Sequence, residues 1–292
     1  MAGESVLSGF TNVAAYVASQ MAPYFRTNIV LLARINAQNF REKQAGVPGS
    51  ASLKFGTRGN VTVSVTSEAA SVTKSTYAES NVSITAQKAS AYVELPIEAE
   101  LFGNDASSLT FLAEDAGAAA ADKFDVDGLA LADSFTQSTG TTNTVLTVNN
   151  LKNAPYKVRL GKVKGPLEYV LHPTQIKDIQ ADLITTGAAV FSNPQVGLDI
   201  LNGQPAENNG FAGKIFNLQV FESTNTKSIN TAVDWAGLCY SPRFAFAAGI
   251  LGRFIVMNDD IPQQVMRGLS LSMFYQIAKW KDAAGCYIIS KQ

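Results

Sequence analysis

Histidine is almost absent from this chain of 292 residues, in which His172 is the only one. A metal site built from two histidines is therefore impossible within one chain. A Ser-His-Asp or Cys-His arrangement would have to use His172, and no GxSxG elbow or other recognisable nucleophile turn accompanies it. We interpret His172 as a strand-end histidine held by a hydrogen bond. An α/β enzyme that uses His172 is the alternative from another class of function.

Charged residues are also scarce, at 16% of the chain with a formal net charge of −1. Proteins that bind nucleic acid through counterion release need a clustered basic surface, which this composition argues against. A hydrophobic content of 46% argues equally against a disordered chain. The length is sufficient for one large domain or two ordinary ones with a real core.

Cysteines and long apolar segments are sparse too. Cys239 and Cys286 match no CxxC or metal-ligand spacing, so we expect reduced structural thiols rather than a disulfide. Residues 1–5 lack the basic start of a signal peptide, and the longest apolar run, residues 244–251, is far shorter than a membrane span. The sequence therefore predicts a protein that folds in a reducing cytoplasm and has no membrane partner.

Two short segments resemble ligand-binding loops but have the wrong spacing. Residues 125–128 faintly resemble a calcium loop, yet Lys123 and Ser134 stand where an EF-hand needs acidic ligands. We expect solvated carboxylates there, near a bend or break in a helix, because Gly and Asp are poor interior helix residues. Residues 161–165 lack the GxxxxGK[ST] spacing of a phosphate loop and predict a basic turn.

The remaining acidic residues do not form a catalytic pattern. Glu94, Glu98 and Glu100 would share one face of one strand, whereas a hydrolase needs two carboxylates opposed across a cleft. A solvated face, or a surface that meets a basic neighbour, is the preferred interpretation. Asp259 and Asp260 precede a proline and predict a turn. We therefore expect no catalytic residue, no metal ligand and no cofactor, and a protein that is not an enzyme.

The periodicity of apolar residues changes near the first third of the chain. Residues 92–101 alternate between apolar and mostly acidic side chains, which predicts a half-buried strand. Residues 105–133 then predict a helix, because apolar side chains recur every three or four positions. These are Leu109, Leu112, Ala116, Ala120 and Phe124. A helix of about 28 residues would be about 40 Å long, against an average of about 11–12 residues, which indicates a mechanical role.

A long hairpin is predicted before this helix. Residues 61–66 and 82–85 alternate between Val or Ile and Ser or Thr, and the polar residues 67–80 join them. A lone two-stranded hairpin is marginal in water, so something else must pack against it.

A mixed α/β lobe is predicted over residues 135–252. Residues 169–173 predict a buried strand that ends at a proline, and 173–186 predict a helix in which Thr174 is the candidate cap. Residues 213–221 predict a further strand by alternation.

The two ends of the chain have simpler patterns. Residues 1–45 predict an extended or helical arm that ends at the loop signal of residues 46–49. Residues 269–276 and 286–290 predict a closing β-hairpin that completes the sheet begun by residues 92–101.

This order of zones resembles the major capsid protein of tailed double-stranded DNA phages. Its Hong Kong-type capsid fold is shared with encapsulins and with the floor of the herpesvirus capsid. Residues 92–133 resemble a strand followed by the spine helix, and residues 168–178 resemble the strand-to-helix step of the axial domain. Residues 210–222 resemble the glycine-then-strand passage, and residues 269–290 the returning sheet.

The resemblance implies an α+β fold divided into five parts. They are an N-terminal arm (1–49), an extended β-hairpin loop (50–92), a peripheral domain with the spine helix (93–135), an axial domain (136–252) and a return to the peripheral domain (253–292).

The resemblance also implies a structural function. The chain would assemble as hexamers and pentamers into an icosahedral head that encloses double-stranded DNA without sequence-specific binding. It would be made in the host bacterial cytoplasm and reside in the virion. An encapsulin-type bacterial compartment shell is the close alternative.

The expected partners are further copies of the chain, a separate scaffolding protein, a portal protein and, as an optional addition, a cement protein. Some relatives begin with a scaffolding segment that a protease removes. This chain has no room for one, so we expect no N-terminal processing. Lys54, Lys74 and Lys88 lie in the zone where some members cross-link covalently, but we do not expect cross-linking here.

Overall fold

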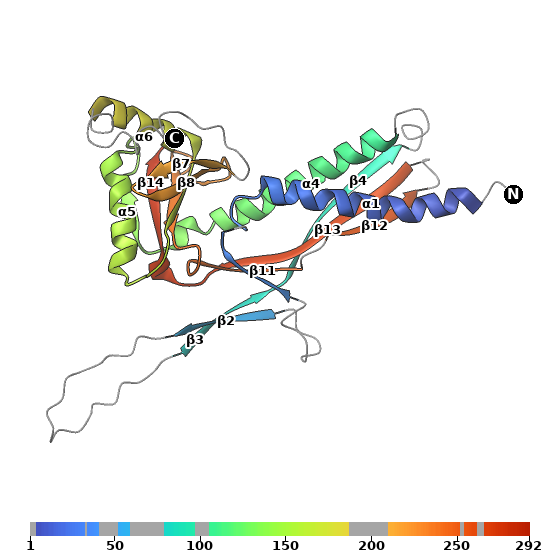
Figure 1. Ribbon diagram of the computed structural model, residues 1–292, viewed down its shortest axis with the longest axis horizontal. Coiled ribbons are helices and arrows are strands. Elements are labelled where there is room, and N and C mark those ends of the chain that lie inside the picture. The colour runs from blue at the N-terminus through green and yellow to red at the C-terminus, as the bar shows by residue number, and fades with distance from the viewer. Residues whose placement is uncertain are drawn as a thin grey trace, which may run out of the picture.

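A computed structural model describes residues 4–32, 34–40, 52–58, 79–96, 105–186, 210–251, 254–261 and 266–292. The molecule is elongated: a lobe lies at one end, two long helices and long strands reach to the other end, and a hairpin leaves between them (Figure 1). None of the described helices has the length and apolar character needed to span a membrane.

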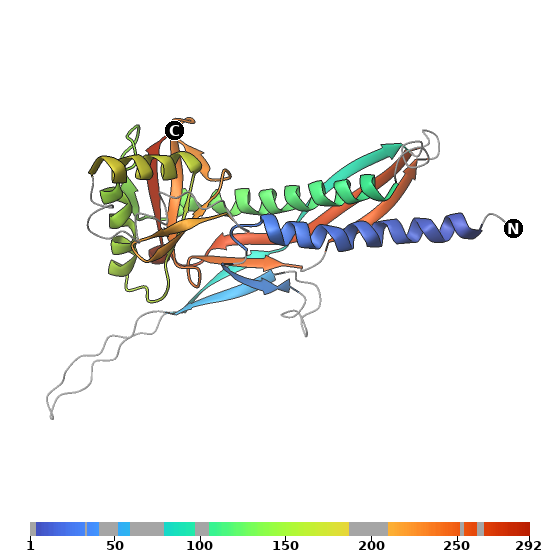
Figure 2. The same cartoon turned by 45° about the horizontal axis from the view of Figure 1, so that its top comes forward.

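Two long helices form the spine of the molecule. The predicted long helix is confirmed as α4 (Asp105–Leu129), which has 25 residues and is therefore about 38 Å long. The predicted N-terminal arm is helical, as α1 (Glu4–Asn28), and it packs along α4 (Figure 2). Gly117 of α4 lies at the contact, where an added Cβ would stand 2.8 Å from the Met21 carbonyl oxygen. A missing side chain therefore sets how closely the two helices approach.

A five-stranded sheet packs against these helices around one central strand. Strand β13 (Met266–Lys279) pairs antiparallel with β4 (Gln87–Pro96) on one side. On its other side it pairs with β12 (Ile255–Ile261) and then with β11 (Phe246–Ile250). Strand β1 (Asn36–Asn39) adds to β11 in parallel. The predicted meeting of the strand near residue 92 with the strand near residue 270 is confirmed, since Tyr92 lies opposite Ser270.

The lobe contains a mixed seven-stranded sheet and two helices that pack with it in one hydrophobic cluster. Its strand order is β5-β14-β10-β6-β8-β7, and β9 also pairs with β10. The strands are β5 (Ser138–Gly140), β6 (Glu168–Leu171), β7 (Phe211–Ile215), β8 (Leu218–Glu222), β9 (Lys227–Ile229), β10 (Asp234–Tyr240) and β14 (Gly285–Lys291). The helices are α5 (Val148–Leu160) and α6 (Pro173–Thr186), with short 3-10 turns η1 (Ala132–Ser134) and η2 (Asp282–Ala284).

The strand and helix predicted over residues 169–186 are confirmed as β6 and α6, but two other predictions for the lobe and C-terminus are wrong. Residues 213–221 are not one strand: Phe216 and Asn217 have φ of 53° and 61°, which turns β7 back onto β8 as a tight hairpin. The predicted closing hairpin does not form either. Strand β13 stays in the spine sheet while β14 pairs with β10 and β5 in the lobe. The division into five named domains stays a prediction.

The predicted extended hairpin is confirmed at its base, with a different partner. Strand β2 (Ser52–Arg58) pairs with β3 (Glu79–Thr85), so Leu53 faces Ile84 and Phe55 faces Val82. Residues 61–66, the predicted partner of residues 82–85, lie outside the described residues. Strand β3 continues almost directly into β4, which joins the hairpin to the spine sheet.

Residues 258–261 were predicted to form a turn, which is wrong. They belong to β12, where Asp259 lies opposite Gly268 and Asp260 opposite Arg267 of β13. Pairing with a long neighbouring strand has overridden the local turn preference of adjacent aspartates.

Replacing Gly117 by leucine should separate α1 from α4. The new side chain has to displace backbone, so we expect the free energy of unfolding to fall by about 1–3 kcal/mol in denaturant titrations. The matched control is Ala119→Leu on the same helix, where the side chain is exposed and room is available. Equal stability of both variants would contradict the close helix contact.

Candidate functional site

The spine and the lobe meet around a buried carboxylate. Asp125 of α4 is 1% exposed, and its two oxygens accept the backbone N–H groups of Val30 (2.7 Å) and Leu31 (3.0 Å), just after α1 ends. Burial raises the pKa of Asp125 to about 6, although these two hydrogen bonds oppose the shift. The prediction of solvated carboxylates near a helix break is therefore wrong for Asp125. The helix continues to Leu129, and the buried Gly128 allows Leu31 to pack closely.

A second group of polar side chains extends this joint into the lobe. The Arg34 Nε lies 3.8 Å from a Glu168 carboxylate oxygen, and its guanidinium carbon lies 3.5 Å from the centre of the Phe221 ring. Burial lowers the pKa of Arg34 and raises the pKa of Glu168, while their opposite charges counteract both shifts. The fully buried Tyr240 lies beside them, and burial raises its pKa well above the usual range. Arg34 thus connects the segment after α1 to Glu168 of β6 and Phe221 of β8, with Tyr240 of β10 alongside.

The Asp125 contact predicts a specific pH dependence. Because the pKa of a free aspartate is near 3.8 and that of Asp125 is about 6, the folded chain binds a proton more tightly between these pH values. The contribution of Asp125 to the free energy of unfolding is therefore largest near pH 4 and declines as the pH rises through 6. Asp125→Asn turns an amide NH₂ towards one of the two backbone N–H donors, whereas even a protonated carboxyl keeps an oxygen at each, so we expect a loss of about 1–3 kcal/mol.

The measurement is urea unfolding of wild type and Asp125→Asn from pH 4 to pH 8. The stability difference should be greatest near pH 4 and should shrink towards pH 7. A difference that grows with pH would show that the ionised carboxylate is the favoured form.

His172 is a helix cap. Its Nδ1 accepts the backbone N–H of Thr174 (3.2 Å), and the Gln175 Oε1 accepts the backbone N–H of His172 (3.2 Å), which is the reciprocal arrangement of a capping box at the start of α6. The ring stacks on Trp235 at 3.8 Å, and burial lowers the pKa of His172. The predicted cap, Thr174, is thus wrong; its hydroxyl instead contacts the same Nδ1 at 2.8 Å. No cysteine or carboxylate hydrogen-bonds to the ring among the described residues.

The cap role is tested by two substitutions of His172. Asparagine is a good N-cap and alanine is a poor one, so His172→Ala should lose about 1 kcal/mol more stability than His172→Asn. Thermal unfolding of both variants measures this, and the loss of Trp235 stacking is common to both. Identical unfolding of the two would contradict the cap.

The other residues singled out in the sequence do not converge on one site. Lys54 is exposed on β2, and Lys88 and Glu94 are exposed six positions apart on β4. Lys74, Glu98 and Glu100 lie outside the described residues. Residues 161–165 form the predicted turn after α5. No group of three or more metal-ligating side chains exists in the part of the chain that the structure describes.

The two cysteines are free and buried, as predicted, but the structure places them face to face. Cys239 of β10 lies opposite Cys286 of β14 in the antiparallel register. Burial raises the pKa of the Cys286 thiol to about 11 and raises the pKa of Cys239 well above its usual range, which keeps both thiols protonated near neutral pH. No local sequence pattern predicts this pairing of strands.

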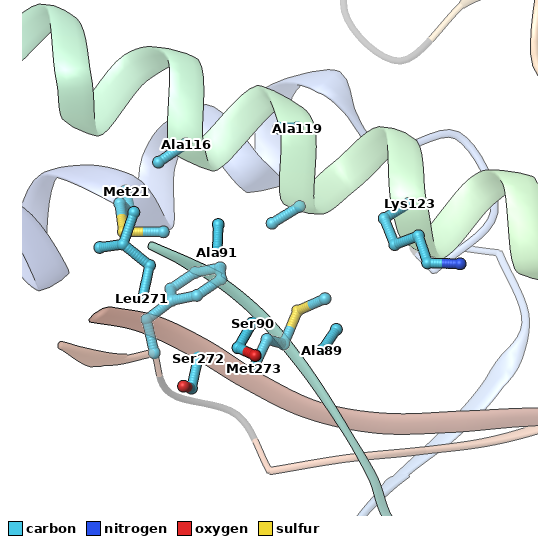
Figure 3. Close-up of a pocket in the computed structure, with 12 residues that line it drawn as sticks. Met21, Ala89, Ser90, Ala91, Ala116, Ala119, Lys123, Leu271, Ser272 and Met273 are labelled. Carbon is cyan, nitrogen blue, oxygen red and sulfur yellow. The ribbon is translucent and has the colours of Figure 1, made fainter. Parts of the chain in front are cut away.

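A shallow apolar groove of about 130 Å³ lies between α4 and the spine sheet. Figure 3 shows Ala116 and Ala119 of α4 on one side and Ala89 and Ala91 of β4 on the other, with Met21 of α1 at one end. The hollow exists because facing side chains are small. Its lining offers methyl groups, two serine hydroxyls and the amine of Lys123, which do not make a catalytic arrangement.

The comparison with known proteins identifies the fold. The sequence matches no protein-family model and no curated protein. Solved structures, however, share its architecture: the mixed sheets, spine helix and hairpin are those of the capsid fold of tailed phages, as predicted.

Three of these structures are particularly informative. The capsid of Helicobacter pylori bacteriophage KHP30 superposes with a TM-score of 0.65 at 12% identity, covering 88% of each chain. The capsid of Ralstonia phage GP4 gives 0.62 at 10% identity, over 91% of this chain and 90% of that one. The SrpI encapsulin of Synechococcus elongatus gives 0.54 at 13% identity, over 73% and 76%. Sequence identities this low establish that the fold is shared, but not that the function is.

Proposed function

We propose that this chain is the shell-forming subunit of a phage head. It assembles as hexamers and pentamers into an icosahedral shell that encloses double-stranded DNA without reading its sequence. The observation that carries the proposal is the coverage of the fold: 88% of this chain superposes on 88% of a phage capsid subunit. The match therefore covers most of the chain rather than one part of it.

The surface of the hairpin supports assembly with a neighbour. The outward side chains of β2 and β3, among them Lys54 and Ser83, are exposed, while Leu53, Phe55 and Ile84 pack on Phe40 and Ala247 of the body. A two-stranded sheet with one solvated face is weak alone. In a shell, a second subunit would cover that face.

A structural role also agrees with the local chemistry. His172 is engaged as a helix cap, and Asp125 is engaged with backbone N–H groups. These two groups, each a conceivable acid or base, therefore have structural roles in the fold. We accordingly propose a virion protein rather than an enzyme, with a separate scaffolding protein and a portal protein as partners and a cement protein as an optional one.

The test is electron microscopy of the full-length protein, expressed with and without candidate scaffolding proteins. We expect closed icosahedral shells, and His172→Ala should assemble as wild type does. A stable monomer under every condition, with a turnover that His172→Ala abolishes, would contradict the proposal and favour the α/β enzyme.

An encapsulin-type compartment is the second candidate, because the SrpI encapsulin shares the fold. The contents of particles purified from the native source separate the two. Nuclease-protected double-stranded DNA supports the phage head, whereas an enclosed cargo protein without DNA supports the compartment.

A further inference from the structure

A basic cleft lies where the hairpin leaves the body. It has a volume of about 610 Å³ and lies between the hairpin, the turn after α5 and the segment between β13 and β14. Thr57 and Ser80 line it from the hairpin side. The cations in its lining are Lys162, Lys164, Arg243 and Lys281.

None of the four cations of this cleft forms an ion pair with a described residue. Asp282, the carboxylate in the lining, is already bound by the Lys279 amine (2.8 Å) and the Thr136 N–H (3.1 Å). Aromatic side chains accompany the cations: the Lys281 amine lies 4.9 Å from the centre of the Phe244 ring. The Trp280 indole N–H is buried without a hydrogen-bond acceptor. The cleft therefore suits a ligand with carboxylates and an apolar group.

A surface of this composition exists on the outer face of α4. Phe111 is 62% exposed, and Glu114 and Asp115 follow it at the third and fourth positions, which places the ring and both carboxylates on one side of the helix. Neither carboxylate forms an ion pair with a described residue. Helix α4 begins at the end of the molecule remote from the lobe, so this face and the cleft are far apart in one copy (Figure 2).

We propose that the basic cleft of one copy binds the Phe111, Glu114 and Asp115 face of α4 in a second copy. The proposal rests on the function proposed above, since it requires the chain to assemble with itself. Two different surfaces meet in this contact, so it is heterologous and closes into a ring when the rotation between copies permits. Opposite charges steer such an encounter and fix its register. Phosphates of nucleic acid would also suit four cations, but the exposed ring between carboxylates matches the aromatic lining and favours a second copy.

The direct test is carbodiimide cross-linking, which joins a carboxylate to a lysine amine as an amide with loss of water. Equal amounts of ¹⁴N- and ¹⁵N-labelled full-length protein are mixed, assembled and analysed by mass spectrometry. We expect mixed-isotope links from Lys162, Lys164 or Lys281 to Glu114 or Asp115. Shells that lack these links would overturn the proposal and leave the proposed function intact. Mixed links in small oligomers that never form shells would support the contact and contradict the proposed function.

Charge reversal gives an independent test. Lys164→Glu with Arg243→Glu should raise the protein concentration needed for assembly at least about tenfold, and Glu114→Lys with Asp115→Lys should do the same. A variant that carries all four substitutions should assemble at a lower concentration than either double variant, because opposite charges face each other again. The control for the cleft variant is Lys152→Glu with Lys177→Glu. It makes the same change in net charge, but on exposed residues outside the cleft. Cleft variants that assemble at the wild-type concentration would overturn the proposal; if their particles also lost nuclease-protected DNA, the cleft would be a phosphate site instead.

Discussion

The structure depends on the carboxylate of Asp125, which holds the backbone of the segment after α1. This contact fixes α1 alongside α4 and directs the chain towards β1, which pairs with β11 of the spine sheet. Phe40, at the end of β1, then packs beneath the hairpin base with Phe55. A buried side chain that accepts two N–H groups is costly to replace, because a substitute that cannot accept from both leaves a donor unpaired. The direction in which the hairpin leaves the body therefore follows from one contact in the spine.

Local periodicity predicted the individual elements well where one period persists. The long helix was placed at residues 105–133 and is found at Asp105–Leu129, and α6 was predicted with the bounds that it has. Helix α5 was missed because Pro155 lies inside it, although Thr147 caps its start and supplies a usable signal. Alternation also merged β7 and β8 into one strand, since a two-residue turn preserves the alternation on both sides.

Local sequence patterns did not predict the contacts between distant segments. That β13 and β14 belong to different sheets depends on which strands they meet, and strand partners carry no local signature. Asp125 looked like a solvated residue because its partners are backbone N–H groups 95 and 94 positions away. His172 is held by a hydrogen bond at the end of a strand, as interpreted from the sequence, yet its capping role needed the geometry of Gln175. The resemblance to capsid proteins was found from the order of zones, and the structure supports it at the level of fold.

The spine packs within one subunit, whereas the hairpin, in the proposed shell, needs a neighbour to cover its outer face. Hydrogen exchange, compared between the monomer and the assembled particle, tests this distinction most directly. The account predicts that the amides of α4 are protected in both states, while those of β2 and β3 exchange quickly in the monomer and slowly in the particle. Equal protection of the hairpin in both states, or loss of protection in α4 on disassembly, would contradict it.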